Sequence, residues 1–164
     1  LDADGIVAEA RRLAAIAKNA VIKVPVMREG LIAVRRLSDE GIKTNVTLLC
    51  STMQAMLAAK MGATYVSPFV GRLDLMGQDG MEVIRQIKTV YDNYNFPTQI
   101  LVASARHPKH VLDAALAGAH ACTIPMEVMD LLHQHPMTDL GIQQFLAAWA
   151  KVPQKREAAA PALV

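Results

Sequence analysis

The sequence alternates short apolar segments with longer amphipathic ones, and this alternation constrains the fold more than any other feature. Apolar segments begin near residues 20, 43, 64, 98 and 120, so three of the four intervals are close to 22 residues. Three of the amphipathic segments end in a glycine just before the next apolar segment, at Gly41, Gly62 and Gly118. Glycine readily takes the left-handed conformation that ends a helix. The pattern therefore predicts a βα repeat with a parallel sheet.

The apolar and amphipathic segments give approximate boundaries for each element. Strands are expected over 22–26, 44–49, 64–70, 99–103 and 121–124, and a loop over 71–74. The first helix is expected to be capped by Asp4 and to end near Lys18. Further helices are expected over about 29–39, 52–61, 79–93, 108–117, 127–133 and 139–151.

Two architectures fit five βα units. The strands could form a complete flavodoxin-like open sheet. Alternatively, they are five of the eight units of a TIM barrel, whose usual length is about 250 residues. The periodicity alone leaves both open, but in either fold the chemistry belongs at the carboxyl ends of the strands.

Composition excludes several classes of partner. The chain has 164 residues, 52% of them hydrophobic, which is enough for one domain with a substantial core. Only 20% are charged, the net charge is +2, and no basic run occurs, so neither a nucleic acid nor a membrane is expected as a partner. No signal peptide or membrane-spanning apolar run is recognisable, and the cytoplasm is the expected location. Cys50 and Cys122 are expected to be buried free thiols.

Lys23 stands in the middle of the apolar, β-branched stretch 19–27. If this strand is buried, the lysine is unusual, because burial favours the neutral amine. A neutral amine is the nucleophile that forms Schiff bases with carbonyl substrates. If the strand lies at a sheet edge, Lys23 points to water and blocks aggregation. The stretch by itself supports both readings equally.

A few other polar side chains lie in the predicted strands. Asn45 and Thr47 are two residues apart and therefore share one face of the second strand. Ser67 and Phe69 share a face of the third strand in the same way. Buried amides and hydroxyls of this kind are common in cores, so these residues become site candidates only because nearly all such groups fall at the same end of successive strands.

Two arginines and a serine follow the ends of the third and fourth strands. Arg72 comes just after the third strand, and Ser104 and Arg106 come just after the fourth. Each arginine taken alone is better explained as an ordinary surface residue. Two guanidinium groups and a hydroxyl at one end of a parallel sheet, however, are suited to binding phosphate. His107 and His110 lie nearby at a helix start, but without a Cys or carboxylate cluster in the sequence they are expected to be solvated rather than metal ligands.

Several of these segments resemble the transaldolase family. The similar segments are 21–26, 41–48, 65–74, 103–108 and 117–125, and the resemblance extends to about Lys151. It is closest to the small bacterial branch that also contains fructose-6-phosphate aldolase. This resemblance implies an α/β fold, a TIM (β/α)8 barrel, of which the chain contains about five strands, the fourth to the eighth.

The resemblance also implies roles for the candidate residues. Lys23 matches the Schiff-base lysine on the fourth barrel strand. Asn45 and Thr47 fall on the fifth strand, beside the bound dihydroxyacetone unit and a catalytic water. The family's phosphate-binding positions correspond to Arg72, Ser104 and Arg106.

One position separates the two activities of the family. The aldolase branch has a tyrosine where this chain has Phe69, whereas transaldolases carry Ser-Pro-Phe, as Ser67-Pro68-Phe69 does here. A phenol can orient water or donate a proton and so help to release the dihydroxyacetone unit. Phenylalanine has no such group, which favours transfer over release.

The chain departs from the family pattern at its beginning. The family has three earlier strands, which carry an acid/base aspartate, an asparagine and a glutamate that partners the water. None of these segments is present, the chain starts with Leu1, and five strands cannot close the barrel. The expectation is that residues 1–151 are the C-terminal portion of a single barrel domain lacking its N-terminal part, followed by a mobile tail over 152–164.

The implied function is that of a transaldolase in the pentose phosphate pathway. It would transfer a dihydroxyacetone unit from sedoheptulose 7-phosphate to glyceraldehyde 3-phosphate, which gives erythrose 4-phosphate and fructose 6-phosphate. The reaction would need no metal or organic cofactor. Its partners would be sugar phosphates and, by analogy with ring-like assemblies in the family, further copies of itself. Two alternatives stay open: a fructose-6-phosphate aldolase, and a non-catalytic sugar-phosphate-binding barrel.

Overall fold

The computed structural model describes residues 2–152 and divides the chain into two compact units. One unit extends to Leu131 and the other begins at Leu132. The described part of the second unit, residues 132–152, contains one helix, α8 (Pro136–Trp149), which starts with proline in its first turn. The predicted tail over 152–164 lies outside the described residues except for Val152. None of the described helices is long and apolar enough to cross a bilayer.

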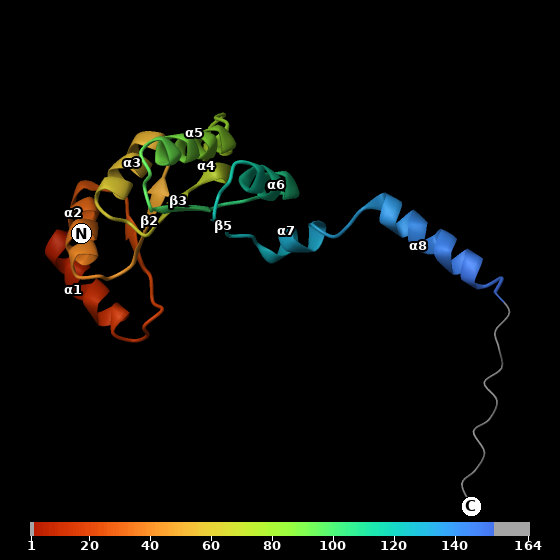
Figure 1. Ribbon diagram of the computed structural model, residues 1–164, viewed down its shortest axis with the longest axis horizontal. Coiled ribbons are helices and arrows are strands. Elements are labelled where there is room, and N and C mark those ends of the chain that lie inside the picture. The colour runs from red at the N-terminus through yellow and green to blue at the C-terminus, as the bar shows by residue number, and fades with distance from the viewer. Residues whose placement is uncertain (1, 153–164) are drawn as a thin grey trace, which may run out of the picture. The chain divides into compact units, whose positions relative to one another are not determined.

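The first unit alternates strands and helices, as the periodicity predicts (Figure 1). Its strands are β1 (Ile22–Pro25), β2 (Thr44–Leu49), β3 (Tyr65–Pro68), β4 (Gln99–Val102) and β5 (Ala121–Cys122). Its helices are α1 (Ala3–Ala14), α2 (Arg28–Asp39), α3 (Thr52–Lys60), α4 (Val70–Leu75), α5 (Gly80–Asn93), α6 (Pro108–Leu116) and α7 (Met126–Leu131).

The order of the strands distinguishes between the two architectures. All neighbouring strands are parallel, and their spatial order β1-β2-β3-β4-β5 equals their order in the chain. A doubly wound sheet needs a point at which this order reverses, and the five strands contain none. Successive right-handed crossovers without a reversal bring the connecting helices onto one face. The fold is therefore that of consecutive units of a TIM barrel, as predicted.

The two faces of the sheet differ in chemistry because side chains alternate along each strand. Val24, Val46, Val66 and Ile100 are fully buried on the face that packs against the helices. The core that they form also includes helix side chains such as Ala10 of α1, Leu37 of α2, Ala55 of α3 and Ile84 of α5. Several of the alternate positions carry polar side chains, and these side chains form the candidate site described below.

Local structure corrects several predicted boundaries. The first helix is capped by Asp2, whose Oδ1 accepts a 2.7 Å hydrogen bond from the Gly5 N–H, and not by Asp4. Asp4 lies in the first turn and forms an ion pair with Arg36 of α2. The helix ends at Ala14, before the predicted Lys18. Residues predicted as the end of the third strand and a loop instead form α4.

The two cysteines are less enclosed than predicted. Cys50 is exposed, because it lies just past the end of β2 in the turn before α3. Cys122 is half-buried in β5, and burial raises the pKa of its thiol. Both are free thiols, in agreement with the prediction.

Candidate functional site

The polar residues of the first three strands lie side by side on one face of the sheet. In the β1–β2 register Lys23 pairs with Asn45, and in the β2–β3 register Thr47 pairs with Ser67. Paired residues of parallel strands direct their side chains to the same face, and residues two apart on one strand do the same. The four side chains therefore form one polar surface on the face opposite the helix-packed core.

Lys23 is exposed among the described residues, so of the two readings that the stretch leaves open, the structure shows the one in which the side chain is not enclosed. Its side chain lies on the face of the sheet away from the helices, and β1 is the first strand of the five in this chain. Its strand is held firmly all the same. A Cβ added to Gly30 in α2 would lie 2.1 Å from the Pro25 carbonyl oxygen, so only glycine fits at this approach of β1 to α2.

Asn45 is oriented by a neighbouring serine. The Ser67 hydroxyl donates a 2.7 Å hydrogen bond to Asn45 Oδ1. With its oxygen accepting this bond, the amide of Asn45 has two N–H groups for other partners. Ser67 itself is fully buried, so the pair forms a fixed element of the polar surface.

Thr47 carries a buried hydroxyl without a partner among the described residues. The β2–β3 register shifts between Thr47 and Leu49, and the intervening Leu48 has a positive φ of 62°. A bulge of this kind redirects side chains at a strand end, and left-handed backbone at a non-glycine residue carries strain. The bulge lies at the carboxyl end of β2, where the chemistry of a barrel is expected.

Contacts between α4 and the segment after β4 bring together the two segments that carry the predicted phosphate-binding residues. The N–H groups of Val70 and Gly71 donate to the carbonyl oxygens of Ala103 and Ser104 at 3.1 and 3.2 Å. A Cβ on Gly71 would lie 2.3 Å from the Ser104 oxygen and 2.7 Å from Arg106 Cγ. Arg72 follows Gly71 directly, so the chain places it beside the segment that carries Ser104 and Arg106.

At this junction between α4 and the segment after β4, side chains are available for a ligand. The Arg72 guanidinium stacks 4.6 Å from the centroid of the Phe69 ring. Ser104 has a positive φ of 64°, and its buried hydroxyl has no partner among the described residues. Arg106 is exposed and lines two adjoining cavities of about 530 and 270 Å³. The larger cavity also contacts Gly71 and Asp74, and the smaller contacts Ser104 and Thr123.

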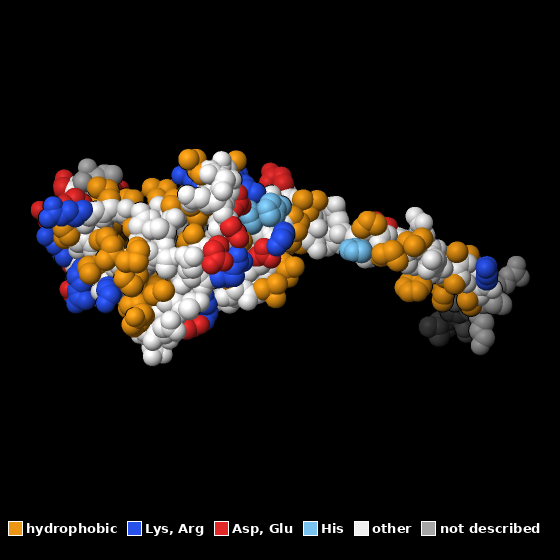
Figure 2. All heavy atoms as spheres, turned by 90° about the horizontal axis from the view of Figure 1, so that it is seen from above, with side chains coloured by type: hydrophobic (Ala, Val, Ile, Leu, Met, Phe, Trp, Pro, Cys, Tyr) orange, Lys and Arg blue, Asp and Glu red, His pale blue; other side chains and the backbone are white. Residues whose placement is uncertain are grey.

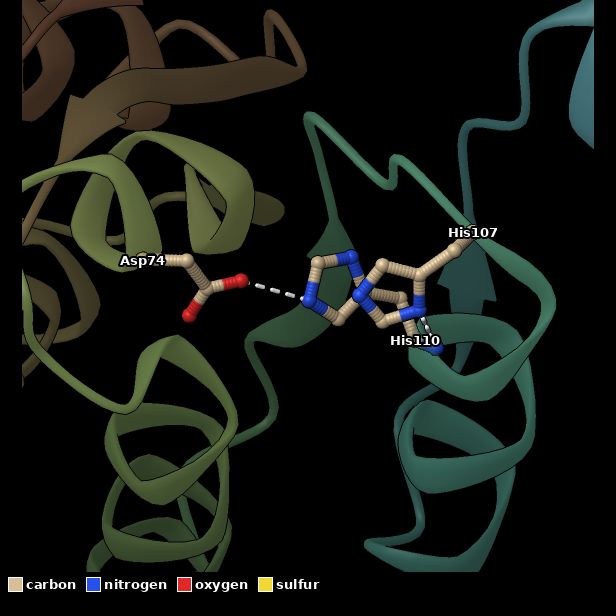
Figure 3. Close-up of side chains that lie close together, drawn as sticks. All are labelled: Asp74, His107 and His110. Atoms are coloured by element: carbon tan, nitrogen blue, oxygen red, sulfur yellow. Dashed lines mark hydrogen bonds and ion pairs between the residues drawn. The ribbon is translucent and has the colours of Figure 1, made fainter.

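A buried histidine at this junction was missed by the sequence prediction. His110 was expected to be solvated, but it is only 4% exposed and its Nε2 lies 2.6 Å from Asp74 Oδ2 (Figure 3). Asp74 belongs to α4 and His110 to α6, so the sequence gives no local signal for the pair. His107 stacks on the His110 ring at 3.7 Å between centroids and caps α6 through Nδ1.

These three residues also have the donor set of a metal site. The ligand atoms of Asp74, His107 and His110 all lie within 4.8 Å of one another. Both nitrogens of His110 already have protein partners, however, because Nδ1 accepts a 3.1 Å hydrogen bond from the Arg106 N–H. The arrangement thus satisfies the buried imidazole without requiring an ion.

Comparison with known proteins is consistent with the geometry. A family model described as Transaldolase/Fructose-6-phosphate aldolase matches residues 1–162. A probable transaldolase of Aquifex aeolicus is 56% identical over 155 residues, which is 94% of this chain and 71% of the relative. A probable transaldolase of Geobacter metallireducens is 60% identical over 154 residues, covering 94% of this chain and 72% of the relative. The chain belongs to the transaldolase/fructose-6-phosphate aldolase family.

Proposed function

We propose that the complete protein is a transaldolase that transfers a dihydroxyacetone unit between sugar phosphates through a Schiff base on Lys23. The observation that carries this proposal is the pairing of Lys23 with Asn45 on the polar face of the sheet. Membership of the family and the probable-transaldolase relatives support it.

The proposed reaction begins at the Lys23 amine. In its neutral form the amine adds to the ketone carbon of a ketose phosphate, and loss of water gives an iminium. A base removes the proton of the C4 hydroxyl, the C3–C4 bond breaks, and its electron pair moves to the iminium. An aldose phosphate leaves, and the dihydroxyacetone enamine stays on Lys23. The enamine then attacks the aldehyde of a second aldose phosphate, and hydrolysis of the resulting iminium releases the new ketose.

The neighbours of Lys23 have groups suited to this sequence. The Asn45 amide, held by Ser67, has N–H groups free to donate to a hydroxyl of the bound dihydroxyacetone unit. The unpartnered Thr47 hydroxyl is suited to hold the water that is lost and regained at the iminium. The base for the C4 hydroxyl is the aspartate that the family resemblance places on the first barrel strand.

The phosphate of each sugar is assigned to the junction between α4 and the segment after β4. Arg72 and Arg106 supply two positive charges, and the unpartnered Ser104 hydroxyl supplies a further donor. Arg106 lines both cavities, so a phosphate there would lie against it. A phosphate dianion matches this donor set better than a neutral sugar hydroxyl would.

Transfer is favoured over release because of Phe69. Its ring supports the Arg72 guanidinium and has no hydroxyl to orient a water or donate a proton to the enamine. The alternative activity is aldol cleavage of fructose 6-phosphate with release of free dihydroxyacetone. Measuring that release in the absence of an acceptor aldehyde separates the two activities.

The wider setting is also part of the proposal. Sugar phosphates as substrates, the pentose phosphate pathway and the cytoplasm follow from the proposed activity, which requires no metal or organic cofactor. Self-association is proposed from the ring-like assemblies of the family and from the apolar side chains of α8, which include Phe145 and Trp149. Figure 2 shows apolar side chains gathered along this helix.

The direct assay follows transfer from fructose 6-phosphate to erythrose 4-phosphate by the complete protein. We expect sedoheptulose 7-phosphate to form with ping-pong kinetics, and Lys23→Arg to abolish it. Exposed Lys43 provides the matched control, since Lys43→Arg should retain full activity. Release of free dihydroxyacetone at the rate of turnover would instead favour the aldolase. Binding of fructose 6-phosphate without either reaction would favour a non-catalytic barrel.

A further inference from the structure

His110 is the only buried histidine among residues 2–152, and no step of the proposed reaction uses it. Its surroundings are polar on two sides. Nε2 lies 2.6 Å from Asp74 Oδ2, and Nδ1 accepts the backbone N–H of Arg106 at 3.1 Å. A nitrogen that accepts a hydrogen bond carries no proton, so the imidazole proton is on Nε2 and is donated to Asp74.

Asp74 is itself held in place from a second direction. Its Oδ1 accepts a 2.9 Å hydrogen bond from the Gly80 N–H at the start of α5. Each carboxylate oxygen therefore has a separate partner, one backbone and one imidazole. A carboxylate that orients an imidazole in this way fixes both the tautomer and the ring position.

The chain of hydrogen bonds ends at a residue of the phosphate-binding junction. Gly80, Asp74, His110 and Arg106 are linked in that order, and the last link holds the Arg106 backbone. The segment before Arg106 is strained at Ser104 and pressed against Gly71, so its conformation depends on such restraints. Arg106 and His110 also line the same cavity. Figure 3 shows the His110 ring facing Asp74.

We propose that His110, oriented by Asp74, is a positioning residue that fixes Arg106 for binding the phosphate group of the substrate. The proposal rests on the proposed function in assigning Arg106 to phosphate. It identifies the Nδ1 acceptor as the essential atom, because that atom contacts the phosphate-binding segment. The bond to Asp74 orients the ring and is of secondary importance.

Two amide substitutions separate the nitrogens of His110. Asparagine places an amide oxygen near the Nδ1 position, so His110→Asn retains an acceptor for the Arg106 N–H. Glutamine reaches the Nε2 position, so His110→Gln retains a donor to Asp74 and loses the acceptor. His133 is exposed in the described chain, and His133→Gln serves as the matched control.

The experiment measures three quantities on each variant of the complete protein. These are hydrogen exchange at the Arg106 amide, the Kd for inorganic phosphate, and the KM values for glyceraldehyde 3-phosphate and unphosphorylated glyceraldehyde. We expect His110→Gln to lose protection at the Arg106 amide and to weaken phosphate binding and raise the KM for the phosphorylated acceptor about tenfold. The KM for glyceraldehyde should change less than about twofold, and His110→Asn should stay close to wild type.

Other outcomes would overturn the assignment. Unchanged Arg106 protection in His110→Gln would do so, as would equal KM increases for both acceptors. Zn²⁺ that raises the Tm of the wild type but not of either His110 variant would identify a metal site instead. Failure of the proposed function gives a different result, because the wild type would then show no transfer at all. Hydrogen exchange at the Arg106 amide and the Kd for phosphate do not depend on transfer and would still test the role of His110.

Discussion

The hydroxyl of Ser67 donates a 2.7 Å hydrogen bond to Oδ1 of Asn45, across the pairing of β2 with β3. Asn45 in turn stands opposite Lys23 in the β1–β2 register. Three neighbouring strands thus contribute one residue each to a connected polar surface. The bond fixes which side of the Asn45 amide is available to a substrate on Lys23.

Ser67→Ala tests this relationship. Loss of the hydrogen bond should lower the free energy of unfolding by about 1 kcal/mol and kcat by roughly tenfold, because Asn45 loses its fixed orientation. Ser51→Ala is the matched control: Ser51 caps α3 through its hydroxyl, and its loss should cost a similar ~1 kcal/mol without changing kcat. Denaturant unfolding and steady-state kinetics measure both effects. Equal kcat values in the two variants would contradict the role of Asn45.

Two unpartnered threonine hydroxyls provide a second comparison. Thr44 and Thr47 both carry buried hydroxyls that have no partner within residues 2–152, but Thr44 aligns with buried Ile22 on the helix-packed face and Thr47 lies on the polar face. Replacing an unsatisfied hydroxyl by a methyl group is neutral or stabilising, so neither valine variant should lower stability. Thr47→Val should lower kcat by about 10- to 100-fold, and Thr44→Val should leave it unchanged. Full activity of Thr47→Val would remove Thr47 from the mechanism.

The βα periodicity and the family resemblance predicted most of the fold. The strand Thr44–Leu49 was predicted to the residue, and the helix α3 was predicted to within one residue at its end. Boundaries failed where local signals compete: both Asp2 and Asp4 can cap a helix, and the backbone conformation selects Asp2. The strand order, which the periodicity left open, depends on long-range pairing that local patterns do not encode.

The candidate site was predicted in part. The sequence identified Lys23, Asn45 and Ser67 by their strand positions, but it did not give the Ser67–Asn45 bond, which joins residues 22 apart. The buried state of His110 depends on Asp74, on a different helix 36 residues earlier (110 − 74 = 36).

Gly71 is predicted to be essential for the phosphate-binding junction. An alanine Cβ would lie 2.3 Å from the Ser104 carbonyl oxygen, so the two backbones would have to separate. Gly71→Ala should lower the free energy of unfolding by about 1–3 kcal/mol and raise the KM for phosphorylated substrates. Gly141→Ala in α8 is the control, because nothing lies within 4 Å of its added Cβ and alanine favours a helix by up to ~1 kcal/mol. An unchanged KM for phosphorylated substrates in Gly71→Ala would contradict the assignment of phosphate to this junction.

Tyr91 gives a prediction for alkaline pH. Burial raises its pKa well above the ordinary value of 10.0, and its hydroxyl donates a 2.8 Å hydrogen bond to the Ala55 carbonyl. The unfolded chain therefore loses this proton before the folded protein does, so the free energy of unfolding falls as the pH rises above about 10. This contribution should reach ~1.4 kcal/mol per pH unit and be absent in Tyr91→Phe.

The same variant should also be less stable at neutral pH. Removing the hydroxyl leaves the Ala55 carbonyl without this partner, at a cost of about 1 kcal/mol. Denaturant unfolding of both proteins at neutral pH and between about pH 9 and pH 11 measures the two effects. If the difference between the proteins is the same at every pH, the pKa of Tyr91 is not raised by folding.

The central claim is that Lys23 forms the Schiff base, and borohydride trapping tests it most directly. The complete protein is incubated with fructose 6-phosphate, reduced and mapped by mass spectrometry, with Lys23→Arg and Lys43→Arg treated in parallel. We predict a reduced dihydroxyacetone adduct on Lys23 in the wild type and in Lys43→Arg, and none in Lys23→Arg. An unmodified Lys23, or an adduct at another lysine that persists in Lys23→Arg, would contradict the claim.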